Sequence, residues 1–313
     1  SDDGFLYCLA TGDGKLLWKK RGHDDGGMVL GNGRLISRWP ARGGPVIADG
    51  VVYWAAGIWP SEGVFIQATD TSTGATLWRN ATAADIVMPQ PHSGAIARSG
   101  ISAQGDLVLA GDRLLVPTGR GVPAAFHRQD GKFLFFHLQT FGKVGGSPTA
   151  ASDSQFFNGG YAFDLATGKS PSFTGHDVMA MAVTPDSIVI ATTNQVAGFD
   201  KSNLWLERKS KSAQRVLKEP QWRIPTSIAT PSSMIVARDR IVVGGPGSIA
   251  VIDIPSRNAV FERTIEGEAL GLASANGRLF VCSTTGAIYC FGAGPAPAPR
   301  PTATIPISNP VPA

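Results

Sequence analysis

The side chains best suited to binding a ligand or a partner lie in short segments rich in glycine and proline. Nine of them together could hold a ligand or a partner: Arg38, Trp39, Arg42, Trp59, Glu62, His92, Arg120, Asn158 and Asn194. Arginine and histidine donate hydrogen bonds to anionic or hydroxylated groups. Tryptophan offers a flat apolar surface to a ring or to a peptide side chain. This set predicts recognition of a protein, a peptide or a glycan if the fold brings the segments together.

The same residues also have a purely structural interpretation. Tryptophan and arginine side chains in loops can fill the space between neighbouring segments and donate hydrogen bonds to loop carbonyl groups. Alanine at Arg42 and Arg120 separates the two interpretations, because a structural role predicts lost stability without any change in ligand binding. Both interpretations stay open at the level of the sequence.

Motifs for catalysis are missing from the sequence. The five histidines, at positions 23, 92, 127, 137 and 176, lack the spacing of metal ligands. No Walker, Gly-x-Ser-x-Gly or His-Glu-x-x-His pattern occurs. We therefore assign no catalytic residue and no metal site.

Composition excludes several classes of protein. The chain of 313 residues is 43% hydrophobic and 17% charged, which supports a full apolar core. No run of 18 apolar residues occurs, so no transmembrane helix is expected. A net charge of +4 is too small to indicate nucleic-acid binding. Three cysteines do not make a disulfide framework in a chain of this length.

An internal repeat supplies the elements that must position the candidate residues. Its unit is an apolar strand, a Thr-Gly turn and a second strand that ends in an aromatic residue, as in residues 5–18 and 65–78. A hairpin with a turn such as Asp49-Gly50 or Asn276-Gly277 precedes each unit, and these residues suit two-residue hairpin turns. Each repeat is thus a four-stranded antiparallel meander of roughly 40 residues, which is typical of a propeller blade.

The segment from Ala48-Asp49-Gly50 through Thr73-Gly74 to Trp78 resembles the repeat of quinoprotein-type (PQQ-like) β-propellers. The resemblance covers about residues 1–291 and implies that the aromatic residue of the fourth strand docks on the next blade. Trp18, Trp78 and Trp222 match that position, Phe136 and Phe261 look like substitutes, and a degenerate copy at 145–173 has Pro171 there. We expect an all-β propeller in residues 1–292, with about seven four-stranded blades represented and seven or eight when complete.

The resemblance also implies functions. Relatives in the assembly-factor branch act as scaffolds in the machinery that inserts β-barrels into the outer membrane. Other relatives are alcohol or sugar oxidoreductases that use PQQ with Ca²⁺, adjacent cysteines and a catalytic aspartate. This chain has no Cys-Cys pair, and only Glu62 and Asp85 are carboxylates on the predicted binding face. We favour a non-catalytic scaffold without a cofactor, in an extracytoplasmic (periplasmic or cell-surface) bacterial protein.

Blade geometry predicts where the candidate residues lie. In a meander blade, the connections between the second and third strands share one face with the crossovers between blades. All nine candidates fall in or beside such connections, where binding residues are commonly carried on a rigid scaffold. We therefore expect a single recognition face.

Two segments interrupt the repeat. Leu204, Arg208, Lys211 and Arg215 recur at helical spacing and predict a short basic helix, either a solvated decoration or a docking point for an acidic partner. Residues 293–313 are rich in proline and alanine, which indicates an extended linker or a tail. As a linker, this segment makes the chain a fragment of a longer multidomain polypeptide, such as a sensor propeller joined to an enzymatic domain.

Cys282 and Cys290 flank Gly286 at equal spacing, so we expect them to face each other across a hairpin. Such a pair forms either a disulfide in an oxidising compartment or two small buried thiols.

Overall fold

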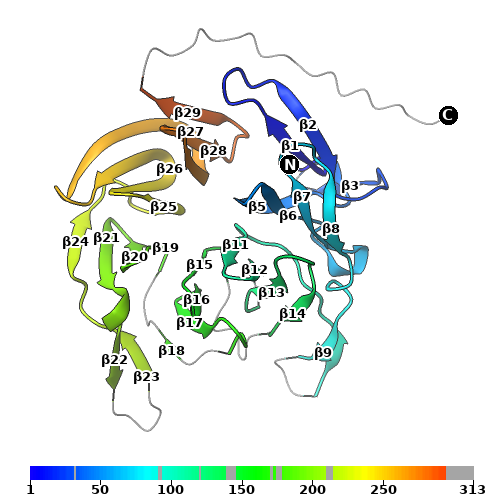
Figure 1. Cartoon of the computed structure of the whole chain (residues 1–313), viewed down its shortest axis with the longest axis horizontal. Helices are drawn as coiled ribbons and strands as arrows, with labels where there is room; N and C mark the ends of the chain where they lie inside the picture. Colours follow the sequence, from blue (N-terminus) through cyan, green and yellow to red (C-terminus); the bar gives the residue numbers. More distant parts are fainter. Residues whose placement is uncertain are drawn as a thin grey trace.

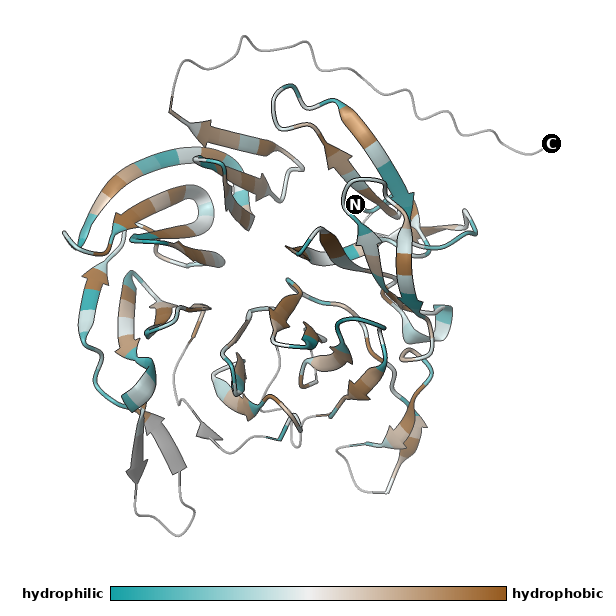
Figure 2. Ribbon diagram, viewed as in Figure 1, coloured by the Kyte–Doolittle hydropathy of each residue, from teal (hydrophilic) through white to brown (hydrophobic). Residues whose placement is uncertain are grey.

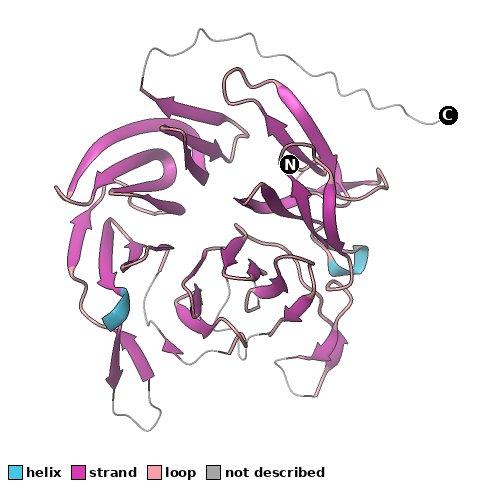
Figure 3. Cartoon of the chain, in the orientation of Figure 1, coloured by secondary structure: helices cyan, strands magenta, loops and turns pink. Residues whose placement is uncertain are grey.

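Antiparallel β-sheets are arranged in a ring in the computed structural model of the chain (Figure 1). The structure describes residues 1–31, 33–90, 94–119, 121–138, 146–169, 172–173, 178–208 and 214–293. In this part of the chain the helical elements are two 3-10 turns, η1 (Pro60–Glu62) and η3 (Lys201–Asn203) (Figure 3). Neither is long enough to cross a membrane.

Four sheets have four strands each, and we number them as blades I to IV. Blade I comprises β5 (Ala41–Ala48), β6 (Val51–Ala56), β7 (Phe65–Asp70) and β8 (Thr76–Asn80). Blade II comprises β11 (Val108–Ala110), β12 (Arg113–Val116), β13 (Ala124–His127) and β14 (Phe133–Phe135). Blade III comprises β15 (Thr149–Ala151), β16 (Gln155–Asn158), β17 (Tyr161–Asp164) and β18 (Ser172–Phe173). Blade IV comprises β19 (Ala180–Val183), β20 (Ser187–Thr192), β21 (Gln195–Asp200) and β24 (Trp222–Pro225).

Blade V has five strands, and the four remaining sheets of the described residues have two strands each. Blade V comprises β25 (Ser233–Ala237), β26 (Arg240–Asp253), β27 (Asn258–Ala275), β28 (Arg278–Ser283) and β29 (Ile288–Gly292). The two-stranded sheets pair β1 (Phe5–Leu9) with β2 (Leu16–Arg21), β3 (Met28–Gly31) with β4 (Arg34–Ser37), β9 (Val87–Pro89) with β10 (Ile96–Arg98), and β22 (Trp205–Arg208) with β23 (Gln214–Leu217). Arg278 Nη1 donates to Thr11 O at 3.3 Å and links the last blade to the first sheet.

The all-β propeller is confirmed, but the expected seven or so four-stranded blades are wrong. The described residues form five blades of four or five strands, and the first repeat forms only the pair β1–β2. Strands β26 and β27 are 14 and 18 residues long, because each continues through a point where the repeat predicts a break. The last two repeats therefore merge into one five-stranded sheet. The linker or tail assigned to residues 293–313 lies outside the described residues from position 294 onward.

The predicted basic helix is also wrong, because the insertion is the hairpin β22–β23 (Figure 1). The residues at helical spacing fall on opposite strands, with Arg208 on β22 and Arg215 on β23, while Lys211 lies outside the described residues. Trp205 and Leu217 are cross-strand partners, and both pack on the apolar cluster between blades III and IV. The hairpin packs these two apolar side chains on the cluster, and this burial outweighs the helical spacing of the charged residues.

Apolar side chains from facing blades build the core. Hydrophobic residues follow the strands, whereas hydrophilic residues gather at the turns (Figure 2). Phe156 of blade III is fully buried, and its ring centroid lies 5.0 Å from that of Phe163 and 6.3 Å from that of Phe135 of blade II. Aromatic stacking thus joins neighbouring blades as well as strands within one blade.

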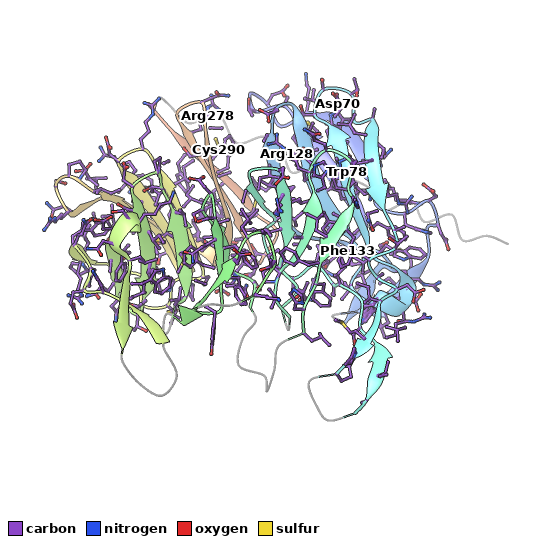
Figure 4. All side chains as sticks on the ribbon, turned by 60° about the horizontal axis from the view of Figure 1, so that its bottom comes forward. Asp70, Trp78, Arg128, Phe133, Arg278 and Cys290 are labelled. Atoms are coloured by element: carbon purple, nitrogen blue, oxygen red, sulfur yellow. The ribbon has the colours of Figure 1, made fainter. Side chains whose placement is uncertain are left out.

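The predicted docking of tryptophan on the next blade is confirmed for Trp18 and Trp78. Trp18 Nε1 donates to Thr71 O at 2.9 Å, and Trp78 Nε1 donates to Arg128 O at 3.0 Å (Figure 4). The Trp78 ring lies against Gly131, whose φ of +71° and missing side chain leave room for the indole. Each indole therefore ties a fourth strand to a turn of the neighbouring blade.

Phe136 does not take the docking position between blades II and III, so the prediction that it substitutes for the tryptophan is wrong. Phe135 lies against Gly168, and His137 Nε2 is 2.9 Å from Thr167 O, so these two residues replace the tryptophan. Phe136 instead is buried between blades I and II. The reason is the two-residue period of extended chain, which sends adjacent side chains to opposite faces.

The turns after the third strands are closed by aspartates. Asp70 Oδ1 accepts hydrogen bonds from Ser72 N at 3.0 Å and Thr73 N at 2.8 Å. Asp164 and Asp200 accept equivalent bonds from Thr167 and Ser202. The hydroxyl groups of Thr73, Thr167 and Ser202 donate to the same carboxylates, and these bonds contribute most to lowering the pKa of Asp70, Asp164 and Asp200 below the ordinary value of 3.8. The backbone amide bonds act in the same direction, because both kinds of bond stabilise the charged carboxylate.

We expect acid to destabilise the ring through these turns. A carboxylate with a lowered pKa stabilises the fold at pH values above its unfolded pKa, near 3.8, and this contribution disappears as the pH falls through the folded pKa. Urea unfolding between pH 3 and 7 measures the effect. The triple variant Asp70→Asn, Asp164→Asn, Asp200→Asn should show a flatter decline of unfolding free energy below about pH 4. An unchanged decline would mean that other carboxylates carry the acid sensitivity.

The two C-terminal cysteines are not cross-strand partners. The register pairs Cys282 with Ile288 and Cys290 with Phe280, so the expectation that the cysteines face each other is wrong. Both thiols are free and exposed, which also corrects their interpretation as buried thiols. The β28–β29 turn is offset from Gly286, and this offset moves the two residues to diagonal positions.

Candidate functional site

Connections of two kinds share one face of the ring, which we call the loop face. In blade I the crossover residue Trp39 donates from Nε1 to Glu62 O, in the connection after the second strand, at 2.6 Å. In blade III, Asn158 Nδ2 donates to the crossover carbonyl Gly146 O at 2.9 Å. In blade IV, Asn194 N donates to Ala229 O of the next crossover at 3.3 Å. The two sets of loops therefore contact each other at blades I, III and IV, as predicted.

Stacked rings and guanidinium groups form a ladder at the start of blade I. The His23 ring lies between Trp39, at a centroid distance of 3.9 Å, and Phe65, at 4.8 Å. Arg38 lies 5.5 Å from the Trp39 ring, and Arg79 lies 4.2 Å from the Phe65 ring. Cation–π attraction at both ends stiffens the stack. We call these residues, with Glu62 and Trp59, the rim cluster.

The rim cluster has a buried base and an exposed surface. Trp39 is only 5% exposed, so its indole holds the loops together. Trp59, at the start of η1, is 41% exposed. Arg38 Nε lies 3.6 Å from Glu62 Oε2, and both side chains are exposed. Trp59 and the Arg38–Glu62 pair are therefore available to a partner, whereas Trp39 supports them.

Two further predicted residues, Asn158 and Asn194, lie on the loop face. Asn158 is buried and fixes a crossover, since its Nδ2 also donates to Pro148 O at 3.0 Å. Asn194 adopts a φ of 56° in the turn between β20 and β21. Thus the side chain of Asn158 and the backbone of Asn194 connect loops in the described structure. His92 and Arg120 lie outside the described residues.

Arg42 belongs to a cavity of about 500 Å³ at the centre of the ring, on the loop face. Six segments around the ring line this cavity, which we call the channel mouth: 41–44, 103–106, 147–149, 180–181, 232–235 and 270–272. The first five lie at or just before the start of β5, β11, β15, β19 and β25, and the sixth lies within β27. Asp106 lies on its wall and accepts a hydrogen bond from the Gly44 amide. Water reaches the carboxylate, but the surrounding wall limits its hydration and this burial raises the pKa of Asp106.

Sequence analysis missed His23, Phe65, Arg79 and Asp106. His23 follows β2, outside the loops that the repeat marked as unusual, and Phe65 and Arg79 look like ordinary strand residues. Asp106 precedes β11 and carries no motif. Only contacts between residues that are distant in the sequence reveal these four residues.

The channel mouth does not fit a calcium-bound quinone. A Ca²⁺ site requires six to eight oxygen ligands, largely from clustered carboxylates and amides. Among the described residues, no three His, Cys, Asp or Glu side chains lie together as metal ligands. We therefore derive no catalytic step through such a group.

The ring of four-stranded meanders with docked tryptophans defines a β-propeller of PQQ-like repeats. The family model described as outer membrane protein assembly factor BamB matches residues 1–204 and 61–293, and the chain belongs to this family. No curated protein sequence matches significantly.

Two solved structures are similar to this chain. BamB from Moraxella catarrhalis shares 14% identity, with a TM-score of 0.56 over 93% of this chain and 91% of that one. The computationally designed Ika8 protein also shares 14% identity, with a TM-score of 0.48 over 93% and 91% of the two chains. At this identity, the match to BamB supports the propeller fold.

Proposed function

We propose that the chain is a non-catalytic scaffold whose loop face binds a partner protein in an extracytoplasmic compartment of a bacterium. The observation that carries the proposal is the rim cluster, where Arg38 packs on the buried, stacked Trp39 and the exposed Trp59 begins the turn that contains Glu62. Tryptophan and arginine dominate the binding free energy of many protein interfaces. A preorganised surface lowers the entropic cost of association.

The family description supports a protein as the partner. Its description as an outer membrane protein assembly factor favours a protein of that machinery over a glycan or a small peptide. The Arg38–Glu62 pair adds one charge of each sign to the rim cluster, so the surface is amphipathic without strong net charge. Such a patch suits a folded protein surface with its own polar rim.

Trp59→Ala should weaken this partner's binding about 30-fold or more, because truncation of a central aromatic anchor commonly costs at least about 2 kcal/mol of binding free energy. The unfolding free energy should change by less than about 0.5 kcal/mol, since Trp59 is exposed. The measurement is the affinity of each variant for a purified outer-membrane assembly protein that copurifies with the wild-type chain.

Leu77→Ala is the matched control, because Leu77 is an exposed apolar residue on the outer strand β8, away from the loop face. Its affinity should equal that of the wild type. Equal binding by the Trp59 variant, or an equal loss in the control, would contradict a binding role of the rim cluster.

A further inference from the structure

The channel mouth combines two opposite charges with apolar and hydroxyl-bearing residues. Arg42 and Asp106 both line the cavity, on neighbouring blades I and II. Within the described part of the chain, neither side chain takes part in an ion pair. Asp2 also lines the cavity, but it is paired with Arg34. One guanidinium and one carboxylate are thus presented to the cavity without an ionic partner there.

Apolar and hydroxyl-bearing residues line the rest of the cavity. Leu270 of β27 is exposed there, whereas Met181 of β19 and Leu272 of β27 also pack on neighbouring apolar clusters. Thr149 and Ser232 add hydroxyl groups to the lining. A cavity of about 500 Å³ is within the size range of small-molecule sites, which commonly combine an apolar lining with a few polar groups that orient the ligand. The arrangement calls for a ligand with an anionic end, a cationic end and an apolar body.

The geometry points to a binding site for a small zwitterion, an apolar α-amino acid or a short apolar peptide, in the channel mouth. Arg42 receives the ligand carboxylate, since a guanidinium suits bidentate pairing with a carboxylate. Asp106 receives the ammonium group, and the exposed Leu270 contacts the apolar side chain. This site is separate from the rim cluster and does not depend on the proposed partner protein.

Isothermal titration of the full chain with L-leucine and with the dipeptide Leu-Leu tests the site and distinguishes the two ligand sizes. Leucinamide lacks the carboxylate and N-acetyl-leucine lacks the ammonium group. Each analogue should bind at least about tenfold more weakly than its parent, because a charge-assisted contact is lost. This comparison uses only the wild-type chain, so it does not depend on the folding of any variant.

Two variants assign the charges. In Arg42→Gln, leucine and leucinamide should bind with nearly equal affinity. In Asp106→Asn, leucine and N-acetyl-leucine should bind with nearly equal affinity. The control variants Arg240→Gln and Asp253→Asn remove an ion pair near the β25–β26 turn, outside the channel mouth, and should bind as the wild type does.

Three results would overturn the site: no binding of leucine or Leu-Leu, equal affinities for the charged ligands and their analogues in the wild type, or unchanged discrimination in correctly folded variants. Thermal melting of each variant verifies its fold. Failure here leaves the affinity measured with Trp59→Ala unaffected, so the two proposals fail separately.

Discussion

Replacing Phe156 with alanine should destabilise the ring by about 4 kcal/mol, because a fully buried aromatic side chain is lost together with its packing on two neighbours. Phe156 lies between Phe135 of blade II and Phe163 of blade III. The cavity left behind cannot collapse easily, since rigid sheets bound it on both sides. Chemical denaturation followed by circular dichroism measures the change in unfolding free energy.

Leu30→Ala is the control for this measurement. Leu30 is 78% exposed on β3, so its truncation should change the unfolding free energy by less than about 0.5 kcal/mol. A loss below about 1 kcal/mol in Phe156→Ala would contradict the role of aromatic stacking between these blades.

Gly131→Ala should lower the unfolding free energy by about 3 kcal/mol through two effects, backbone strain and crowding of Trp78. The same substitution at Gly50 separates the two effects. At Gly131 the φ of +71° strains an L residue, and a Cβ would lie 2.3 Å from Cε3 of Trp78. Gly50 has a similar φ of +75° but open space around its Cβ position, so Gly50→Ala should cost only about 1 kcal/mol. The difference between the two variants measures the crowding of the docked indole.

A double variant checks the origin of that difference. If the Cβ of alanine at position 131 collides with the indole, Trp78→Ala should remove most of the collision, so the two changes together cost less than their sum. Unfolding free energies of the two single variants and the double variant give this coupling. Additive losses, or equal losses in Gly131→Ala and Gly50→Ala, would mean that Trp78 does not dock as described.

Much of the fold could be predicted because the repeat carries its own turn chemistry. The Thr-Gly turns and the positions of Trp18 and Trp78 follow directly from local pattern. The blade number could not be predicted, because whether β26 and β27 break or continue depends on sheet curvature and pairing. Likewise, a one-residue offset decides whether Phe135 or Phe136 faces the next blade, and short repeats leave this offset undetermined.

The candidate site was predictable only in part. Unusual residues in loops led to Arg38, Trp39, Trp59 and Glu62, which the structure brings together. Trp39 is buried and supports the loops, whereas Trp59 is exposed, and sequence spacing does not reveal this difference in burial. Asp106 joins Arg42 at the channel mouth only because two innermost strands meet there.

Site-specific photocrosslinking in native cells tests most directly whether the loop face binds a partner. A benzoylphenylalanine residue is placed at position 59 in one variant, and at position 257, in the turn between β26 and β27, in another. A discrete adduct with an outer-membrane assembly protein is expected from position 59 and none from position 257. Adducts of equal yield from both positions, or an adduct with this protein from position 257 alone, would contradict the account.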